Sequence, residues 1–148
     1  MCWKTFKTPD KFACQIMLKL TKKVEYALMA IRYIYHQGDD QVVSTKEIAK
    51  NLHISNELLA KVLQQLTRLD ILFAVQGPKG GYGLNKPLSS INLTEFMEAV
   101  EGPIGVTDCS INAICDQLEQ CNIRFPLNKI NKDIRSMFSN ITLKELAC

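Results

Sequence analysis

The chain has 148 residues, of which 47% are hydrophobic and 22% are charged, and its formal net charge is +3. This length suits one ordinary hydrophobic core with a second small subregion. No apolar run reaches the length needed to cross a bilayer, and the first residues lack the continuous hydrophobic stretch of a secretory signal, so we expect a cytoplasmic protein. In that reducing compartment the six cysteines are expected to be metal ligands or inert thiols rather than disulfides.

The charge is unevenly distributed along the chain. Residues 17–90 contain ten Lys and Arg against six Asp and Glu, a balance of +4, whereas residues 91–148 contain five against eight, a balance of −3. A basic N-terminal half suits a polyanionic partner, although a solvated basic face of this size is also common.

The regular pattern of the chain starts at Met17. We expect residues 1–16 to be a disordered extension, or a segment upstream of a functional start at Met17. Thr21 then caps a helix that ends at the turn beginning with Gly38. The apolar residues of this helix recur three and four positions apart; they are Val24, Ala27, Leu28, Ile31, Ile34 and Tyr35.

Two short helices follow, joined by a tight connection at positions 53–55. Ser44 and Glu47 have the spacing of a capping box at the start of the first helix, and Ser55 caps the second. Two helices this close predict a helix-turn-helix with the second as recognition helix, although paired amphipathic helices also occur in bundles. The second helix is expected to bury Leu58, Leu59, Val62, Leu63, Leu66 and Leu69.

The next segment predicts a β-hairpin. Residues 71–75 are strand-like, residues 77–81 form a cluster of turn-forming residues, and residues 82–84 form a return strand. A hairpin in this place is the wing of a winged-helix domain. The predicted fold is therefore mainly α with a small β wing, and residues 17–90 form a winged helix-turn-helix DNA-binding domain.

Side chains on these elements fit two kinds of DNA contact. Lysines on the first short helix and at the wing tip suit phosphates, which position a protein without reading the base sequence. In the first turns of the recognition helix, Asn suits adenine, Glu suits the cytosine amino group and Lys suits guanine. The residues expected at the DNA are Lys46, Lys50, Ser55, Asn56, Glu57, Lys61, Gln76 and Lys79, with Arg68 nearby in sequence.

Three cysteines beyond this domain share one spacing. Cys109, Cys115 and Cys121 have five residues between successive thiols, which is longer than in zinc knuckles and suits a loop around a polynuclear cluster. Inert or incidental thiols explain the cysteines equally well on these grounds. A nucleophilic thiol would need a nearby His or positive charge, and residues 109–121 contain neither His nor Lys. We therefore do not expect an enzyme.

The C-terminal segment predicts a dimerisation helix followed by a short terminal helix. Pro126 suits the first turn of the long helix, and the apolar residues after it alternate three and four positions apart, as in a coiled-coil seam. The same strip could instead pack on its own domain. A second capping box starts at Thr142. The predicted seam consists of Leu127, Ile130, Ile134, Met137 and Ile141.

Several segments together resemble the IscR/NsrR-like (Rrf-type) winged-helix iron-sulfur regulators. They are LKLTKKVEYALMAIRYI, STKEIAKNLHISNELLAKVLQQLTRLDIL, the wing VQGPKGGYGL, the three late cysteines and the ending NITLKEL. The resemblance spans residues 17–146. It implies a homodimer that binds double-stranded operator DNA, with an iron-sulfur cluster on Cys109, Cys115 and Cys121, a [4Fe-4S] cluster being slightly favoured over [2Fe-2S]. Residues 91–125 would then hold a helix and the cluster loop, and residues 126–148 the dimerisation and terminal helices.

The resemblance leaves the fourth cluster ligand open. The two-iron branch uses a histidine three residues after the third cysteine, where this chain has Arg124. The nitric-oxide-sensing branch uses a carboxylate from the first helix of the partner subunit, and the corresponding residue is Glu25, for which a solvated surface role is the alternative. His36 and His53 are further candidates. Many members carry an arginine that enters the minor groove where this wing has Gln76.

These observations predict a transcription regulator, with repression as the expected sign. An iron-sulfur cluster sensing redox state, nitric oxide or iron-sulfur supply would control its operator affinity. Because the cluster loop lies between wing and dimer helix, its state would change the spacing of two recognition helices, which must match one DNA turn of about 34 Å. The alternatives are a cluster-free family regulator answering to a metabolite, and a metal-binding redox or cluster-transfer protein.

Overall fold

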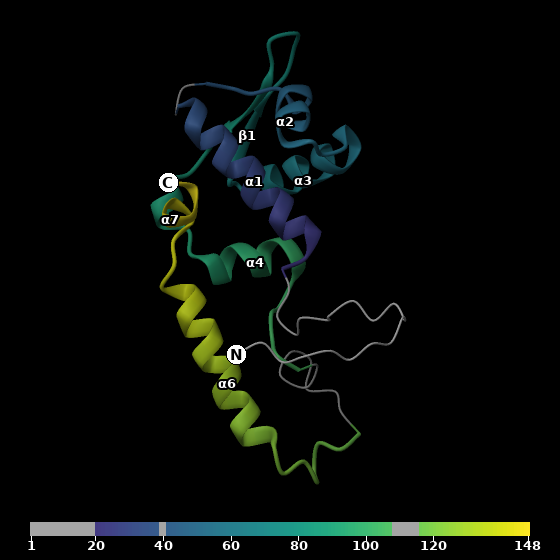
Figure 1. Ribbon diagram of the computed structural model, residues 1–148, viewed down its shortest axis with the longest axis vertical. Coiled ribbons are helices and arrows are strands. Elements are labelled where there is room, and N and C mark those ends of the chain that lie inside the picture. The colour runs from purple at the N-terminus through teal and green to yellow at the C-terminus, as the bar shows by residue number, and fades with distance from the viewer. Residues whose placement is uncertain (1–19, 39–40, 108–115) are drawn as a thin grey trace, which may run out of the picture.

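The computed structural model describes residues 20–38, 41–107 and 116–148. A winged-helix domain occupies one end of the molecule, and one long helix runs away from it toward the other end (Figure 1). The predicted fold class is confirmed, because the described chain is mostly helical with a single two-stranded antiparallel sheet. The elements are α1 (Lys22–Gln37), α2 (Thr45–Leu52), α3 (Asn56–Arg68), β1 (Leu72–Val75), β2 (Gly81–Leu84), η1 (Leu88–Ser90), α4 (Leu93–Glu101), α6 (Arg124–Ser139) and α7 (Leu143–Ala147).

The first three helices begin where the sequence places capping side chains. The hydroxyls of Thr21, Ser44 and Ser55 each accept a hydrogen bond from a backbone N–H three residues further on. Such caps satisfy donors that the first helical turn leaves without partners. Helix α2 ends at His53, which adopts the left-handed conformation with φ 53°. This conformation reverses the chain sharply, so that α3 starts only three residues later.

The core lies between α1, α3 and the elements that follow the wing. Ala27 and Ala30 of α1 and Phe96 of α4 are fully buried, and the small alanine side chains let neighbouring helices approach closely. The prediction for α3 is confirmed at Leu59, Val62, Leu63 and Leu66, whereas Leu69 is half-buried. It is wrong at Leu58, whose side chain is 51% exposed. A helix turns by about 100° per residue, so Leu58 lies about 40° from buried Val62 but roughly 100° or more from Leu59 and Leu63, at the border of the apolar side.

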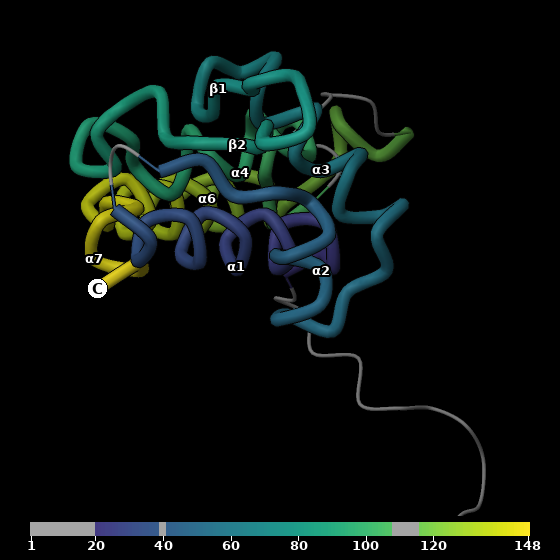
Figure 2. The backbone as a smooth tube through the Cα atoms, turned by 90° about the horizontal axis from the view of Figure 1, so that it is seen from above, coloured from purple at the N-terminus to yellow at the C-terminus, as the bar shows by residue number. Residues whose placement is uncertain are grey.

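The wing is a short antiparallel hairpin attached to the segment before α2. Strands β1 and β2 pair from Leu72 opposite Leu84 to Val75 opposite Gly81, and Tyr82 also pairs with Val43. Gly81 permits this second pairing, since a Cβ atom there would lie 2.4 Å from the carbonyl oxygen of Val43. Seen from above, the hairpin lies on one side of the winged-helix domain and α1 on the other (Figure 2).

The end of the described chain returns to the winged-helix domain. Helix α7 contacts α1 and η1, and Figure 2 shows it beside the C-terminal end of α1. Its Leu143 N–H donates to the carbonyl of Ile91 at 2.9 Å, and Leu93 N–H donates to the carbonyl of Ile141 at 2.8 Å. The predicted capping box at Thr142 is present in both directions. Within the described ranges, no helix combines the length and hydropathy that crossing a membrane requires.

Candidate nucleic-acid interface and metal centre

The start of the recognition helix presents polar side chains to solvent. Ser55 fixes the first turn of α3, because its hydroxyl accepts the N–H of Leu58 at 3.3 Å. Asn56, Glu57 and Lys61 follow, and all three are exposed. Donors and acceptors of this kind, near the N-terminus of a helix narrow enough for the major groove, are what base-edge contacts require. The sequence-predicted base-reading residues therefore lie together on one exposed helical segment.

Lysines border this segment on two other elements. Lys46 and Lys50 are exposed on α2, and Lys79 is exposed at the tip of the wing, with Gln76 exposed before it. Helix α2, the start of α3 and the wing all lie at the end of the molecule opposite α6 (Figure 1). The backbone approaches itself closely at the wing tip, where a Cβ atom at Gly80 would lie 2.1 Å from the carbonyl oxygen of Val75, so this turn requires glycine.

A polar network fixes α2 against α1. The Asn51 amide donates to the Tyr33 hydroxyl at 2.9 Å and to the Glu47 carbonyl at 2.8 Å, and that hydroxyl donates to the Glu47 carboxylate at 3.3 Å. Partial desolvation and the nearby charge of Glu47 both raise the pKa of Tyr33. Sequence reasoning missed this network, because the three residues come from two helices and form no motif.

A second set of bonds joins the recognition helix to the end of α4. The Gln65 amide donates to the Val100 carbonyl at 2.9 Å, and the Lys23 ammonium donates to the same oxygen at 2.7 Å. The Thr21 hydroxyl donates to the carboxylate of Glu101 at 2.8 Å. The last turn of α4 is thus attached to both α1 and α3, immediately before the chain continues toward the cysteines.

Only one of the three cysteines lies among the residues that the structure describes. Cys121 is a half-buried free thiol shortly before α6, whereas Cys109 and Cys115 lie outside the described residues. Among the residues that are described, no three His, Cys, Asp or Glu side chains gather closely enough to hold a metal ion. Two members of the predicted ligand set are not among those residues. Three thiolates and one carboxylate are nonetheless a donor set that fits an iron-sulfur cluster chemically.

The candidates for a fourth ligand lie at separate places. Glu25 is in the first turn of α1, partly exposed, and its carboxylate pairs with the Lys22 ammonium at 2.5 Å. His36 is in the last turn of the same helix, about 16 Å further along at 1.5 Å per residue. His53 closes α2. Arg124, which replaces the histidine ligand of the two-iron branch and is not a candidate itself, is exposed at the start of α6. Of these, Glu25 lies near the junction between α1 and the end of α4, where the cysteine segment starts.

Helix α6 contacts its own domain through several polar groups, and its Phe138 packs against the core. Arg135 forms an ion pair with Glu98 of α4, and the hydrogen bond from Arg135 is the main reason that the pKa of Glu98 is lowered. The Thr94 hydroxyl donates to the Arg135 carbonyl at 3.0 Å and accepts from the Ser139 hydroxyl at 3.0 Å. The N–H of Val106 donates to the Asn131 amide oxygen at 3.2 Å.

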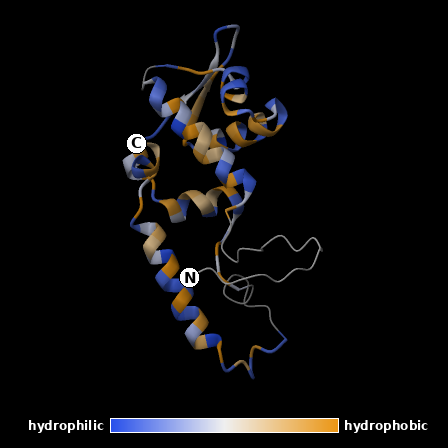
Figure 3. Ribbon diagram, viewed as in Figure 1, coloured by the Kyte–Doolittle hydropathy of each residue, from blue (hydrophilic) through white to orange (hydrophobic). Residues whose placement is uncertain are grey.

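The predicted seam, which runs along α6 to Ile141 just beyond its end, is only partly covered in the single chain. No residue of this 16-residue helix is buried, and apolar positions recur along its length between polar ones (Figure 3). Ile130 is 47% exposed and Met137 53% exposed, whereas Leu127 and Ile134 are half-buried. Of the five predicted seam residues, only Ile141 packs against the core cluster. Packing on its own domain covers part of the strip and leaves Ile130 and Met137 exposed, so the pairing of two such helices stays a prediction.

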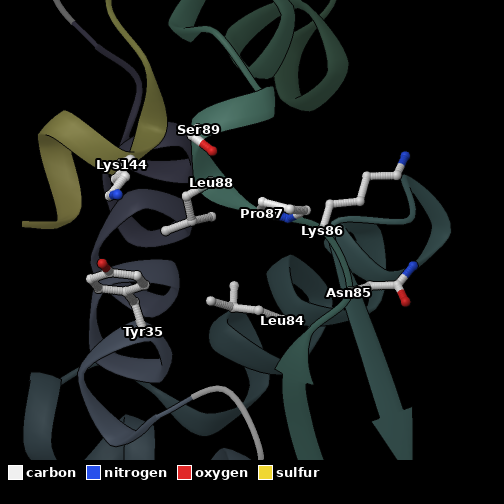
Figure 4. Close-up of a pocket in the computed structure, with 8 residues that line it drawn as sticks. All are labelled: Tyr35, Leu84, Asn85, Lys86, Pro87, Leu88, Ser89 and Lys144. Atoms are coloured by element: carbon white, nitrogen blue, oxygen red, sulfur yellow. The ribbon is translucent and has the colours of Figure 1, made fainter.

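A small hollow lies between α1, the segment after β2 and α7. Its volume is about 380 Å³. Figure 4 shows Tyr35, Leu84 and Leu88 facing one another across it, with the Lys144 side chain at one edge. Most of the lining residues are exposed, and only Leu88 is buried.

Solved structures of bacterial regulators share this architecture. CymR of B. subtilis, described as its global cysteine regulator, is 22% identical with a TM-score of 0.72, over 88% of this chain and 96% of that one. CymR of Staphylococcus aureus is 26% identical with a TM-score of 0.61, over 86% and 96% of the two chains. IscR of T. potens is 22% identical with a TM-score of 0.68, over 87% and 85%.

A family model covers nearly the whole described chain. The model is that of the Rrf2 family, described as iron-dependent transcriptional regulators, and it matches residues 20–148. Members of this family are DNA-binding transcription regulators that typically dimerise, and they are not enzymes. The match covers the winged-helix domain, the cysteine segment and the C-terminal helices together. The chain therefore belongs to the Rrf2 family of winged-helix transcriptional regulators.

Proposed function

We propose that this chain is a homodimeric repressor of operator DNA whose affinity is set by an iron-sulfur cluster on Cys109, Cys115 and Cys121. The observation that carries the DNA-binding part is the exposed polar start of α3, with Asn56 and Glu57 beside lysines of α2 and the wing. The cluster part rests on the three evenly spaced cysteines and on the family's description as iron-dependent. The signal would be redox state, nitric oxide or iron-sulfur supply.

Within this proposal the chain has three working parts. Residues 17–90 read DNA, with phosphate contacts from Lys46, Lys50 and Lys79. Residues 91–125 contain α4 and the cluster loop, and residues 126–148 contain the dimer helix and the terminal helix. Residues 1–16 precede the family match and have no role in the proposal.

The proposed cluster is held by three thiolates and by Glu25 of the partner subunit. When bound, a cluster of this class supplies a reversible change of charge and ligation, with [4Fe-4S] slightly favoured. A single carboxylate is a more labile ligand than a thiolate, which suits a sensor that must lose or exchange one ligand. To reach the cluster, Glu25 would leave Lys22, and an ion pair this exposed to solvent is only a weak restraint.

The proposed dimer forms along the apolar strip of α6. Arg135, Ser139 and Asn131 hold the helix to its own domain, so the strip containing Ile130 and Met137 is left for another surface. A second copy of α6 offers the same strip, and pairing two of them buries both in the manner of a coiled-coil seam. Because α6 extends from the domain that carries α3, this pairing would fix the distance between two recognition helices.

The test of the cluster uses the full chain purified without oxygen and reconstituted with iron and sulfide. We expect a coloured protein containing both elements, and we expect Cys115→Ala to abolish the colour. Cys148→Ala is the matched control, because this exposed C-terminal thiol lies outside the proposed ligand set. A wild-type protein that stays colourless after reconstitution would refute the cluster.

The same preparation tests the fourth ligand. Glu25→Ala should keep the three thiolates yet give a cluster that is lost faster in air and has an altered spectrum. His36→Ala is the control, because it lies at the far end of α1. A normal spectrum for Glu25→Ala together with an altered one for His36→Ala would move the fourth position to the histidine.

The second candidate is a cluster-free regulator that answers to a metabolite. The hollow between α1 and α7 favours it, since about 380 Å³ lies within the range of small-molecule sites. Operator binding that responds to no cluster but changes with a small molecule would support this candidate. Cluster transfer or redox turnover without DNA binding would instead support a metal-binding redox protein.

A further inference from the structure

One apolar side chain stands among the polar residues at the start of the recognition helix. Leu58 is the third residue of α3 and is 51% exposed, whereas Leu59 next to it is fully buried. The leucine pattern of α3 predicts both to be buried. An isolated exposed leucine on a protein surface needs no explanation. Leu58, however, lies in the segment that is proposed to read DNA, so its side chain would face a base in the complex.

The first turn of α3 fixes the position of Leu58. Its N–H donates to the Ser55 hydroxyl at 3.3 Å, so this residue belongs to the capped turn. Exposed Glu57 precedes it and exposed Lys61 follows three residues later. Residues three apart are neighbours on a helix surface. An α3 that brings Glu57 and Lys61 to base edges therefore brings the Leu58 side chain to the same groove.

The major groove offers one apolar group on its base edges. That group is the 5-methyl of thymine, which cytosine and uracil lack. A leucine among polar readers contacts this methyl favourably, and the contact removes apolar surface of both partners from water. We propose that Leu58 reads a thymine methyl group in each operator half-site. The proposal rests on the DNA-binding function proposed above and adds to it a residue that distinguishes thymine from cytosine.

The test starts from an operator selected by the wild-type protein from a pool of random duplexes. Each thymine of one half-site is then replaced in turn by uracil, which removes only the methyl group. We expect one such replacement to weaken wild-type binding about three- to tenfold, the effect of one lost apolar contact. Leu58→Ala should bind the thymine operator more weakly by a similar factor, and it should show almost no further loss on the uracil duplex.

Glu57→Ala is the matched control, because it alters the neighbouring reader and keeps Leu58. This variant should still lose affinity when the same thymine becomes uracil. Thermal unfolding of Leu58→Ala should stay close to that of the wild type, since half of the leucine side chain is already in solvent.

Four results would overturn the proposal, and they are distinguishable. A wild type that binds its operator but tolerates every uracil replacement refutes the methyl contact and leaves DNA binding intact. An unchanged uracil effect in Leu58→Ala assigns the methyl to another residue. A Leu58→Ala protein that becomes monomeric at concentrations where the wild type is dimeric assigns the leucine to a protein interface. Failure to select any operator overturns the proposed function together with this inference.

Discussion

Lys79 at the wing tip gives the sharpest test of the DNA-binding surface. It is exposed in a hairpin that is held in register by pairing of Val75 with Gly81. Lys79→Ala therefore removes one positive charge without disturbing the fold. A dimer carries two copies, and each neutralised phosphate contributes about −0.9 to the slope of log affinity against log salt. The slope should accordingly become shallower by about 1.8.

The expected loss of affinity follows from this slope. At 0.1 M salt, counterion release alone makes Lys79→Ala bind roughly 60-fold more weakly than the wild type. Between 50 and 200 mM salt the difference between the two proteins should shrink by about twelvefold. Because phosphates carry no sequence information, the loss should be similar for the operator and for a scrambled duplex.

The assay is fluorescence anisotropy with both duplexes at several salt concentrations. Lys132→Ala is the matched control: it removes the same charge from an exposed site on α6, at the opposite end of the molecule from the wing (Figure 1). A slope that Lys79→Ala leaves unchanged, or that Lys132→Ala changes equally, would show that the wing tip does not contact phosphate.

Two further predictions concern α6. Ile130→Asp should raise the dimer dissociation constant at least 100-fold in analytical ultracentrifugation, because pairing would bury the new charge at a position that is exposed in the single chain. Ser136→Asp, on a different side of the helix, should leave the dissociation constant unchanged. Equal effects of the two substitutions would argue against the seam. The lowered pKa of Glu98 contributes stability that is fully present above its ordinary value of 4.5 and is lost as the pH falls through the lowered value. At pH 7, Glu98→Gln should therefore be less stable to unfolding than the wild type, by roughly 1 kcal/mol or less for such a partly exposed pair. This difference should shrink as the pH falls through the lowered pKa of Glu98, and a difference independent of pH would contradict this assignment.

Local signals in the sequence predicted most elements of the winged-helix domain. Thr21, Ser44 and Ser55 cap helices because their hydroxyls bond backbone groups only three residues away, and such short-range chemistry is readable from sequence. The wing was predictable because glycines mark a turn between two strand-like segments. Leu58 was misplaced because it borders the apolar side of α3, and spacing alone does not show where the core ends.

The contacts that place α4 and α6 could not be predicted in this way. Gln65 bonds a carbonyl 35 residues away, and Arg135 pairs with a carboxylate 37 residues away. Neither residue belongs to a motif, and each looks like an ordinary surface residue of an amphipathic helix. For the candidate cluster, Cys121 alone among the three thiols lies within the described residues, so the ligand set stays a prediction.

Because α7 packs on the winged-helix domain, its position in the sequence determines when a chain that is being synthesised can complete its hydrophobic core. Leu143 and Ala147 are 1% and 2% exposed and belong to the same core as α1 and α3. During synthesis the recognition helix and wing leave the ribosome long before these two residues do. The surfaces of α1 and η1 that α7 covers therefore stay exposed until the dimer helix has also emerged. A shortened chain ending before Leu143 would keep every proposed DNA contact yet expose apolar core surface, which makes it a poor substitute for the whole protein in binding studies.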